Sequence, residues 1–187
     1  MSWKNDVQRI LIAKEDVQKR VAELGAQLTK DYQGKNLLVL GILKGAVIFY
    51  SDLVRSIDLP LQMDFIGISS YGAGTKSTGA VKFLKDTDQP IEGLDVLVVE
   101  DIVDTGLTLN YLLENLSARK PASLKTCCLL DKPQRREVVI EADYVGFKIP
   151  NEFVVGYGLD YNGLYRNIPD IGVLSPRAYG DIAQDIE

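Results

Sequence analysis

The sequence predicts an α/β fold with a mainly parallel central sheet flanked by helices. Three short segments, 37–43, 96–99 and 124–130, are apolar on both faces, as strands buried inside a sheet are. The first two are each followed by a turn and a segment with apolar residues at helical spacing. Strands that alternate with helices in this way pair in parallel, which gives the predicted class.

A helix of about 17 residues is expected before the first of these strands, and Gly34 marks its end. Its buried face is formed by five apolar residues at helical spacing: Val17, Val21, Leu24, Leu28 and Tyr32. A second helix is expected through residues 47–54 and a third through 109–116. The sequence predicts that the third helix is preceded by a turn that runs from Glu100 to Gly106.

The rest of the chain predicts smaller elements. Residues 63–69 and 80–84 form a hairpin, and the intervening segment 71–79 is too rich in glycine, serine and threonine to pack. Short strands are expected around 144–147 and 153–155, and the tail beyond them has no clear periodicity. A length of 187 residues suits one domain with a small appended lobe.

Composition excludes several kinds of chemistry. The formal net charge is −5, so no overall basic field attracts nucleic acid or anionic lipid. The chain contains no histidine, which excludes Ser-His-Asp and Cys-His nucleophiles, histidine zinc sites and histidine acid–base catalysis. Proton transfer must therefore use carboxylate, lysine or tyrosine side chains.

The two cysteines, Cys127 and Cys128, lie in an apolar run and are expected to be core residues. The apolar runs are far shorter than the roughly 20 residues of a membrane span, and the first residues lack the apolar core of a signal peptide. These features favour a reducing, cytoplasmic location.

Residues 100–108, Glu-Asp-Ile-Val-Asp-Thr-Gly-Leu-Thr, follow the strand at 96–99, where ligands bind in open parallel sheets. The second half offers hydroxyls, backbone N–H groups and a helix N-terminus to a phosphate. The two adjacent carboxylates suit ribose hydroxyls or the waters of a hard cation. A sugar phosphate is the ligand that fits both halves, although Asp104-Thr105-Gly106 alone would also suit a simple helix-capping turn.

Residues 98–108 resemble the phosphoribosyl-pyrophosphate signature of type I phosphoribosyltransferases. More narrowly, the chain resembles bacterial hypoxanthine-guanine phosphoribosyltransferases. This resemblance lies in residues 41–46, 69–72, 130–133, 144–147 and 153–161. It implies the type I phosphoribosyltransferase fold, with residues 1–187 as a single domain whose small hood lobe is formed from the termini.

The resemblance implies a purine salvage enzyme that uses Mg²⁺. Hypoxanthine or guanine would displace pyrophosphate from phosphoribosyl pyrophosphate, giving IMP or GMP. Departure of pyrophosphate leaves positive charge on the ribose, which nearby anionic groups stabilise. A homodimer or homotetramer is also implied, with neither nucleic acid nor membrane as a partner.

The resemblance assigns Asp104 as the catalytic proton acceptor at the imidazole edge of the purine. Glu100 and Asp101 would bind the ribose hydroxyls and Mg²⁺, and Asp160 would be a further metal ligand. The 5′-phosphate cradle would be Thr105, Gly106, Leu107 and Thr108. Pyrophosphate would contact Leu43, Lys44, Gly45 and Arg166, with a non-proline cis peptide at Leu43–Lys44 and with Arg136 as a weaker second candidate.

The base would be recognised by Lys132, whose ammonium donates to the 6-oxo group that adenine lacks. Phe153 would stack on the purine, and the Val154 backbone would meet its edge. Ser70 and Tyr71 would belong to a mobile loop that closes over the site.

Three alternative functions have different requirements. An enzyme that prefers xanthine would differ only in a few backbone contacts. A nucleotide-responsive RNA-binding regulator of the same fold would need a basic face, which the net charge disfavours. A dinucleotide-binding module would need Gly-x-Gly-x-x-Gly after the first strand, and residues 40–45 do not supply it.

Overall fold

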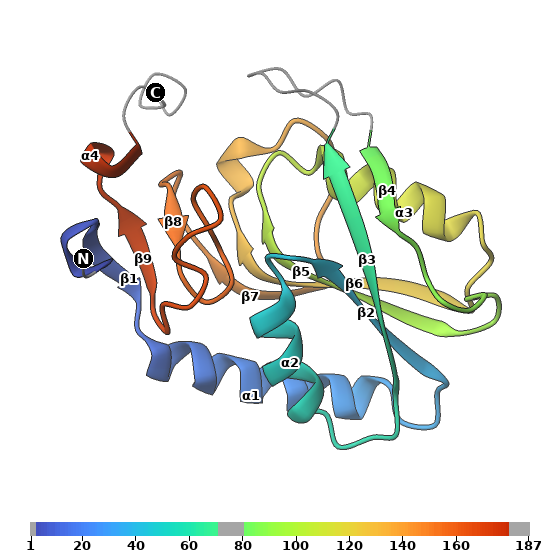
Figure 1. Ribbon diagram of the computed structural model, residues 1–187. Helices are drawn as coiled ribbons and strands as arrows, with labels where there is room; N and C mark the ends of the chain where they lie inside the picture. Colours follow the sequence, from blue (N-terminus) through green and yellow to red (C-terminus); the bar gives the residue numbers. More distant parts are fainter. Residues whose placement is uncertain (1–2, 71–80, 180–187) are drawn as a thin grey trace.

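A computed structural model describes residues 3–70 and 81–179, and its larger sheet has the order β4-β3-β2-β5-β6-β7 (Figure 1). The strands are β2 (Leu37–Leu43), β3 (Gln62–Ser70), β4 (Val81–Lys85), β5 (Asp95–Val103), β6 (Ser123–Asp131) and β7 (Tyr144–Lys148). All neighbours pair in parallel except β3 and β4, which form the predicted antiparallel hairpin. The predicted mainly parallel α/β fold is confirmed.

Helices cover both faces of this sheet, with α1 (Lys14–Asp31) and α2 (Val47–Arg55) on one face and α3 (Leu107–Ser117) on the other (Figure 1). Successive strand residues point to opposite faces. In β2, Leu37 and Val39 pack with α1 and α2, whereas Leu38 and Leu40 pack with α3. This alternation explains why the strands are apolar throughout. The presence of α1, α2 and α3 confirms the three predicted helices.

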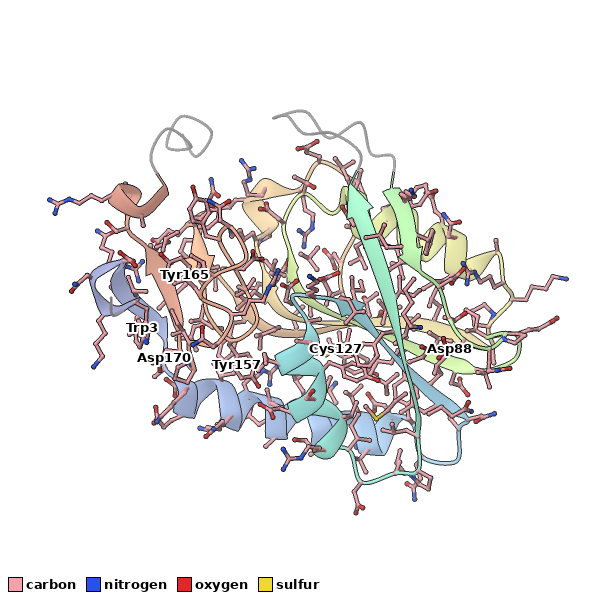
Figure 2. The ribbon with its side chains drawn as sticks, viewed as in Figure 1. Trp3, Asp88, Cys127, Tyr157, Tyr165 and Asp170 are labelled. Atoms are coloured by element: carbon pink, nitrogen blue, oxygen red, sulfur yellow. The ribbon has the colours of Figure 1, made fainter. Side chains whose placement is uncertain are left out.

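The second sheet has three strands in the order β1-β9-β8, all antiparallel. They are β1 (Val7–Ile12), β8 (Val154–Val155) and β9 (Ile171–Leu174), with the short helices η1 (Trp3–Asn5) and α4 (Pro176–Tyr179) beside them. Trp3 and Tyr165 pack on its small core of Val155, Ile168 and Leu174, and Figure 2 shows both on this side of the molecule. The sequence analysis missed β1, β9 and α4, because segments this short carry too little periodicity.

The predicted turn from Glu100 to Gly106 is wrong in its first half. Strand β5 continues to Val103, because Glu100, Ile102 and Val103 pair with Cys128, Leu130 and Asp131 of β6. Pairing with a buried neighbour therefore extends a strand into residues whose charged side chains suggest a turn. As a result, Glu100 and Asp101 stand on the end of β5 itself.

The hairpin prediction extends beyond the residues that the structure describes. Ser70 ends β3, whereas Tyr71 and the expected hairpin tip lie outside the described residues. Cys127 and Cys128 are buried in β6, as expected, and their thiols are not paired. Within residues 3–70 and 81–179, no helix is long and apolar enough to cross a membrane.

Candidate active site

The carboxyl ends of β2, β5 and β6 lie along one edge of the larger sheet. The register pairs Gly41 with Val99 and Val103 with Asp131, so the three strands end at similar heights. The segments that follow them begin at Lys44, Asp104 and Lys132. Parallel pairing thus brings together three loops that are far apart in the sequence.

A pocket of about 110 Å³ lies at the end of β5, with Asp104, Thr105, Gly106 and Thr108 in its lining. Gly106 has a φ of 84°, and a Cβ there would lie 2.5 Å from Ile140 Cγ2. Glycine is therefore required where the chain turns into α3. The first N–H groups of α3 have no partner within the helix, and N–H groups of this kind can donate to an anion.

The loop after β2 packs against two other segments. The Leu43–Lys44 peptide is cis, in agreement with the expectation, and the Lys44 side chain is exposed. A Cβ on Gly45 would lie 1.7 Å from Asp101 Oδ2, and one on Gly158 would lie 2.1 Å from the Gly45 carbonyl oxygen. The backbone at Gly45 is thus enclosed between the end of β5 and the segment after β8.

Two adjacent carboxylates, Glu100 and Asp101, lie near the carboxyl end of β5. The Asp101 N–H donates to Glu100 Oε1 at 3.1 Å, and the Ile102 N–H donates to Asp101 Oδ1 at 2.8 Å. Burial and then the neighbouring Asp101 charge raise the pKa of Glu100 well above its ordinary value. A ligand that brings hydroxyls or positive charge would relieve this repulsion.

Asp160 and Arg166 form an ion pair beside the Gly45 loop. Arg166 Nη2 lies 2.6 Å from Asp160 Oδ1, and Arg166 Nη1 donates to the Gly158 carbonyl at 2.6 Å. The Gly163 N–H donates to Asp160 Oδ2 at 2.7 Å. The structure therefore places the expected metal ligand and the expected pyrophosphate contact next to each other.

The acidic side chains fit a magnesium ion that arrives with its substrate. Among residues 3–70 and 81–179, no cluster of three or more His, Cys, Asp or Glu side chains is arranged to hold a metal. Mg²⁺ is usually bound by one or two carboxylates, water and substrate phosphate oxygens, without a cage of protein ligands. Glu100, Asp101 and Asp160 supply carboxylates of this kind at the same edge of the sheet.

Asp104 lies between two cationic side chains. Arg135, at the end of η2 (Pro133–Arg135), has Nε 3.2 Å from Asp104 Oδ1, and Lys132 Nζ is 3.9 Å from Asp104 Oδ2. Lys132 is only 6% exposed, and burial lowers the pKa of its ammonium. Because 3.9 Å exceeds hydrogen-bond length, the Lys132 ammonium is still able to donate to a ligand.

Arg136, the weaker candidate for a pyrophosphate contact, makes several contacts within the protein. Its guanidinium donates to the carbonyls of Val103, Asp104 and Ile140, and it pairs with Asp131. These partners connect β6, the Asp104 turn and the segment after η2. Arg136 therefore fixes the geometry of the loop that carries Asp104.

Phe153 directly precedes strand β8 of the small sheet, and Val154 begins that strand. Phe153 is half-buried, and the Tyr161 ring contacts it edge-on, with ring centroids 5.7 Å apart and planes at 89°. Val154 is buried in β8 and pairs with Val173. An aromatic ring fixed by a second ring is a suitable stacking surface for a planar base.

The sequence analysis missed two features of this site. It did not predict that Arg135 contacts Asp104, although the Arg135-Arg136 pair shortly after a strand end was a visible signal. It also gave no role to Gly158, whose φ of 104° and contact with Gly45 emerge only when the two sheets are brought together.

The mainly parallel sheet and the pocket at the end of β5 are those of the phosphoribosyltransferase class. The model of the phosphoribosyl transferase domain family matches residues 9–162, and the chain belongs to this family. Within this family, the chain is similar to a protein named hypoxanthine-guanine phosphoribosyltransferase.

A hypoxanthine-guanine phosphoribosyltransferase of Staphylococcus aureus is 56% identical over 177 residues, which are 95% of this chain and 99% of that protein. A crystal structure of a hypoxanthine phosphoribosyltransferase from Staphylococcus aureus superposes with a TM-score of 0.93 at 56% identity, covering 95% of this chain and 97% of that one. The bifunctional protein TilS/HprT of Listeria innocua is 54% identical over 96% of this chain, which spans only 28% of that longer protein.

Proposed function

We propose that this chain transfers the phosphoribosyl group of phosphoribosyl pyrophosphate to hypoxanthine or guanine, giving IMP or GMP and pyrophosphate in purine salvage. The observation that carries the substrate assignment is the buried Lys132 side chain, whose Nζ lies 3.9 Å from Oδ2 of Asp104, a residue that lines the pocket at the end of β5. An ammonium donor suits the 6-oxo acceptor of hypoxanthine and guanine, whereas adenine has an amino donor at the same position.

The residues divide the reaction between them. Thr105 to Thr108 hold the 5′-phosphate at the start of α3, and Glu100 and Asp101 hold the ribose hydroxyls. The bond from the ribose C1′ to pyrophosphate breaks as the purine N9 bonds to C1′, and Asp104 accepts the proton from the imidazole edge. Carboxylates near the ribose stabilise the positive charge that develops on it.

The diphosphate side of the site would be formed by the Gly45 loop and Arg166. Ser70 and Tyr71 would also contribute to substrate binding. Mg²⁺, when bound with the substrate by Glu100, Asp101 and Asp160, would neutralise charge on the leaving group. Phe153 would stack on the base and the Val154 backbone would meet its edge. This assignment uses side chains and backbone groups that the fold brings to one edge of the larger sheet.

The domain organisation, the cellular compartment and the oligomeric state of the enzyme are also part of this proposal. Residues 1–187 form one domain, in which the small sheet is the hood lobe. The enzyme works in the cytoplasm, in keeping with two unpaired buried thiols. It assembles as a homodimer or homotetramer, which sedimentation at several protein concentrations tests directly.

A spectrophotometric assay with phosphoribosyl pyrophosphate, Mg²⁺ and each of hypoxanthine, guanine, xanthine and adenine tests the function. Turnover of hypoxanthine and guanine is expected, with little turnover of adenine and loss of activity when EDTA is added. Adenine turnover equal to that of hypoxanthine would contradict the role of Lys132. A marked preference for xanthine would identify the enzyme as a xanthine phosphoribosyltransferase instead.

A further inference from the structure

The two oxygens of the Asp104 carboxylate have different surroundings. Arg135 Nε donates to Oδ1 at 3.2 Å, whereas Oδ2 faces the Lys132 ammonium at 3.9 Å, beyond hydrogen-bond length. The purine must enter on the Lys132 side if Lys132 reads its 6-oxo group. Oδ2 is therefore the oxygen turned towards the proton that leaves the base.

The backbone fixes the position from which Arg135 reaches Asp104. The Lys132 N–H donates to the Val103 carbonyl at 2.9 Å, and the Glu137 N–H donates to the Thr105 carbonyl at 3.0 Å. These two bonds flank the Arg135–Asp104 contact on both sides in the sequence. The segment 132–137 thus stays joined to the Asp104 turn whether or not residue 135 is an arginine.

The Arg135–Asp104 ion pair is a weak source of stability. The side chains are 38% and 40% exposed, and ion pairs this exposed contribute between nothing and about 1 kcal/mol. Arg136, by contrast, carries the bonds that hold the turn to β6. The two adjacent arginines therefore differ in what they contact: Arg136 bonds to the backbone of the turn and to β6, whereas Arg135 contacts the Asp104 carboxylate.

We propose that Arg135 is a positioning residue, which holds Asp104 Oδ1 so that Oδ2 is aimed at the imidazole edge of the purine. A carboxylate on a turn would otherwise rotate about its side-chain bonds, and small misplacements of a reacting group are costly in rate. The inference rests on the proposed function, because it assumes that Asp104 accepts the purine proton.

The test compares Arg135→Gln and Arg135→Lys with the unaltered chain in the hypoxanthine assay. Arg135→Gln is expected to lower kcat roughly tenfold, with little change in KM for phosphoribosyl pyrophosphate, because the phosphate pocket is intact. Arg135→Lys keeps a donor and should recover part of the lost kcat. Arg119→Gln is the matched control, since Arg119 pairs with Asp86 away from the site, and its kcat should be unchanged.

A double-mutant cycle separates positioning from a general structural effect. In an Asp104→Asn background, Arg135→Gln should cause no further loss of kcat, since there is no carboxylate left to aim. Losses that add, or a melting temperature lowered enough to explain the lost activity, would overturn the role of Arg135. So would an unchanged kcat in Arg135→Gln while the unaltered chain is active. An inactive unaltered chain would instead overturn the proposed function itself, and this inference with it.

Discussion

Gly45 packs directly on the carboxylate of Asp101, so that a Cβ at Gly45 would lie 1.7 Å from Asp101 Oδ2. This contact joins the loop after β2 to the end of β5, the two segments proposed to hold the diphosphate and the ribose. No side chain fits there unless Asp101 moves. The position of the carboxylate proposed to bind ribose thus depends on a glycine more than 50 residues earlier in the sequence.

Gly45→Ala should therefore displace Asp101 and weaken catalysis. We expect kcat/KM for phosphoribosyl pyrophosphate to fall at least roughly tenfold, the cost of a misplaced binding group. Steady-state kinetics with saturating hypoxanthine measures this. Gly93→Ala is the control, because nothing lies within 4 Å of its Cβ position and its φ of 75° should cost only about 1 kcal/mol of stability. Equal kcat/KM values for both variants would contradict the role of the Gly45–Asp101 contact.

Asp104→Asn should slow the chemical step and leave binding of phosphoribosyl pyrophosphate largely intact. The amide cannot accept the purine proton, and loss of a general base costs roughly 10²- to 10⁴-fold in turnover. Rapid-quench kinetics measures the step, and calorimetric titration measures substrate binding. Asp58→Asn, at an exposed carboxylate after α2, serves as the control. A collapse of binding would reassign Asp104 to holding the substrate.

Phe153→Leu should weaken binding of IMP and GMP alike, by about 1–3 kcal/mol, the usual contribution of base–aromatic stacking. Every purine presents a π-face, so this loss should not discriminate between them. The control is Phe147→Leu in β7, which packs against the main core and should lower only the melting temperature. Unchanged IMP affinity with a lowered melting temperature in Phe153→Leu would make Phe153 a core residue.

Lys132→Met should abolish discrimination for 6-oxopurines and raise the melting temperature at neutral pH. Burial lowers the pKa of Lys132. At neutral pH folding therefore buries a charged ammonium, which lowers the stability of the folded state. Between the folded and the unfolded pKa the unfolded chain binds more protons, and stability from this group increases as pH rises through the folded pKa. Melting curves from neutral to alkaline pH should converge for the two proteins. A lower melting temperature in Lys132→Met throughout would show that the ammonium stabilises the fold.

The same pKa direction predicts how activity depends on pH. As pH rises through the folded pKa of Lys132, which lies below the ordinary value of 10.5, the ammonium loses its charge. KM for hypoxanthine should then increase, because a neutral amine is a weaker donor to the 6-oxo group. KM for phosphoribosyl pyrophosphate, measured over the same pH range, should not show this increase. Parallel increases in both KM values would contradict this assignment.

Much of the main sheet could be predicted because its signals are local. Two-sided apolar strands such as β2 reveal that both faces are covered, and helical spacing in α1 and α3 reveals what covers them. The segment 100–108 carries the phosphate and ribose chemistry in consecutive residues, so its place at the end of a strand indicates a site. The extent of β5 could not be predicted, because its last residues are held by pairing with β6.

The sequence by itself determined the class of fold and the segment proposed to hold the sugar phosphate, since both depend on neighbours along the chain. The residues proposed to read the purine came from the resemblance to a known family. Only the tertiary structure decided that β1 and β9, from opposite ends of the chain, complete one small sheet. It also decided that Gly158 meets Gly45 and that Arg135 holds Asp104. Such contacts depend on how distant segments pack, and hydrophobic patterning over a few residues carries no information about them.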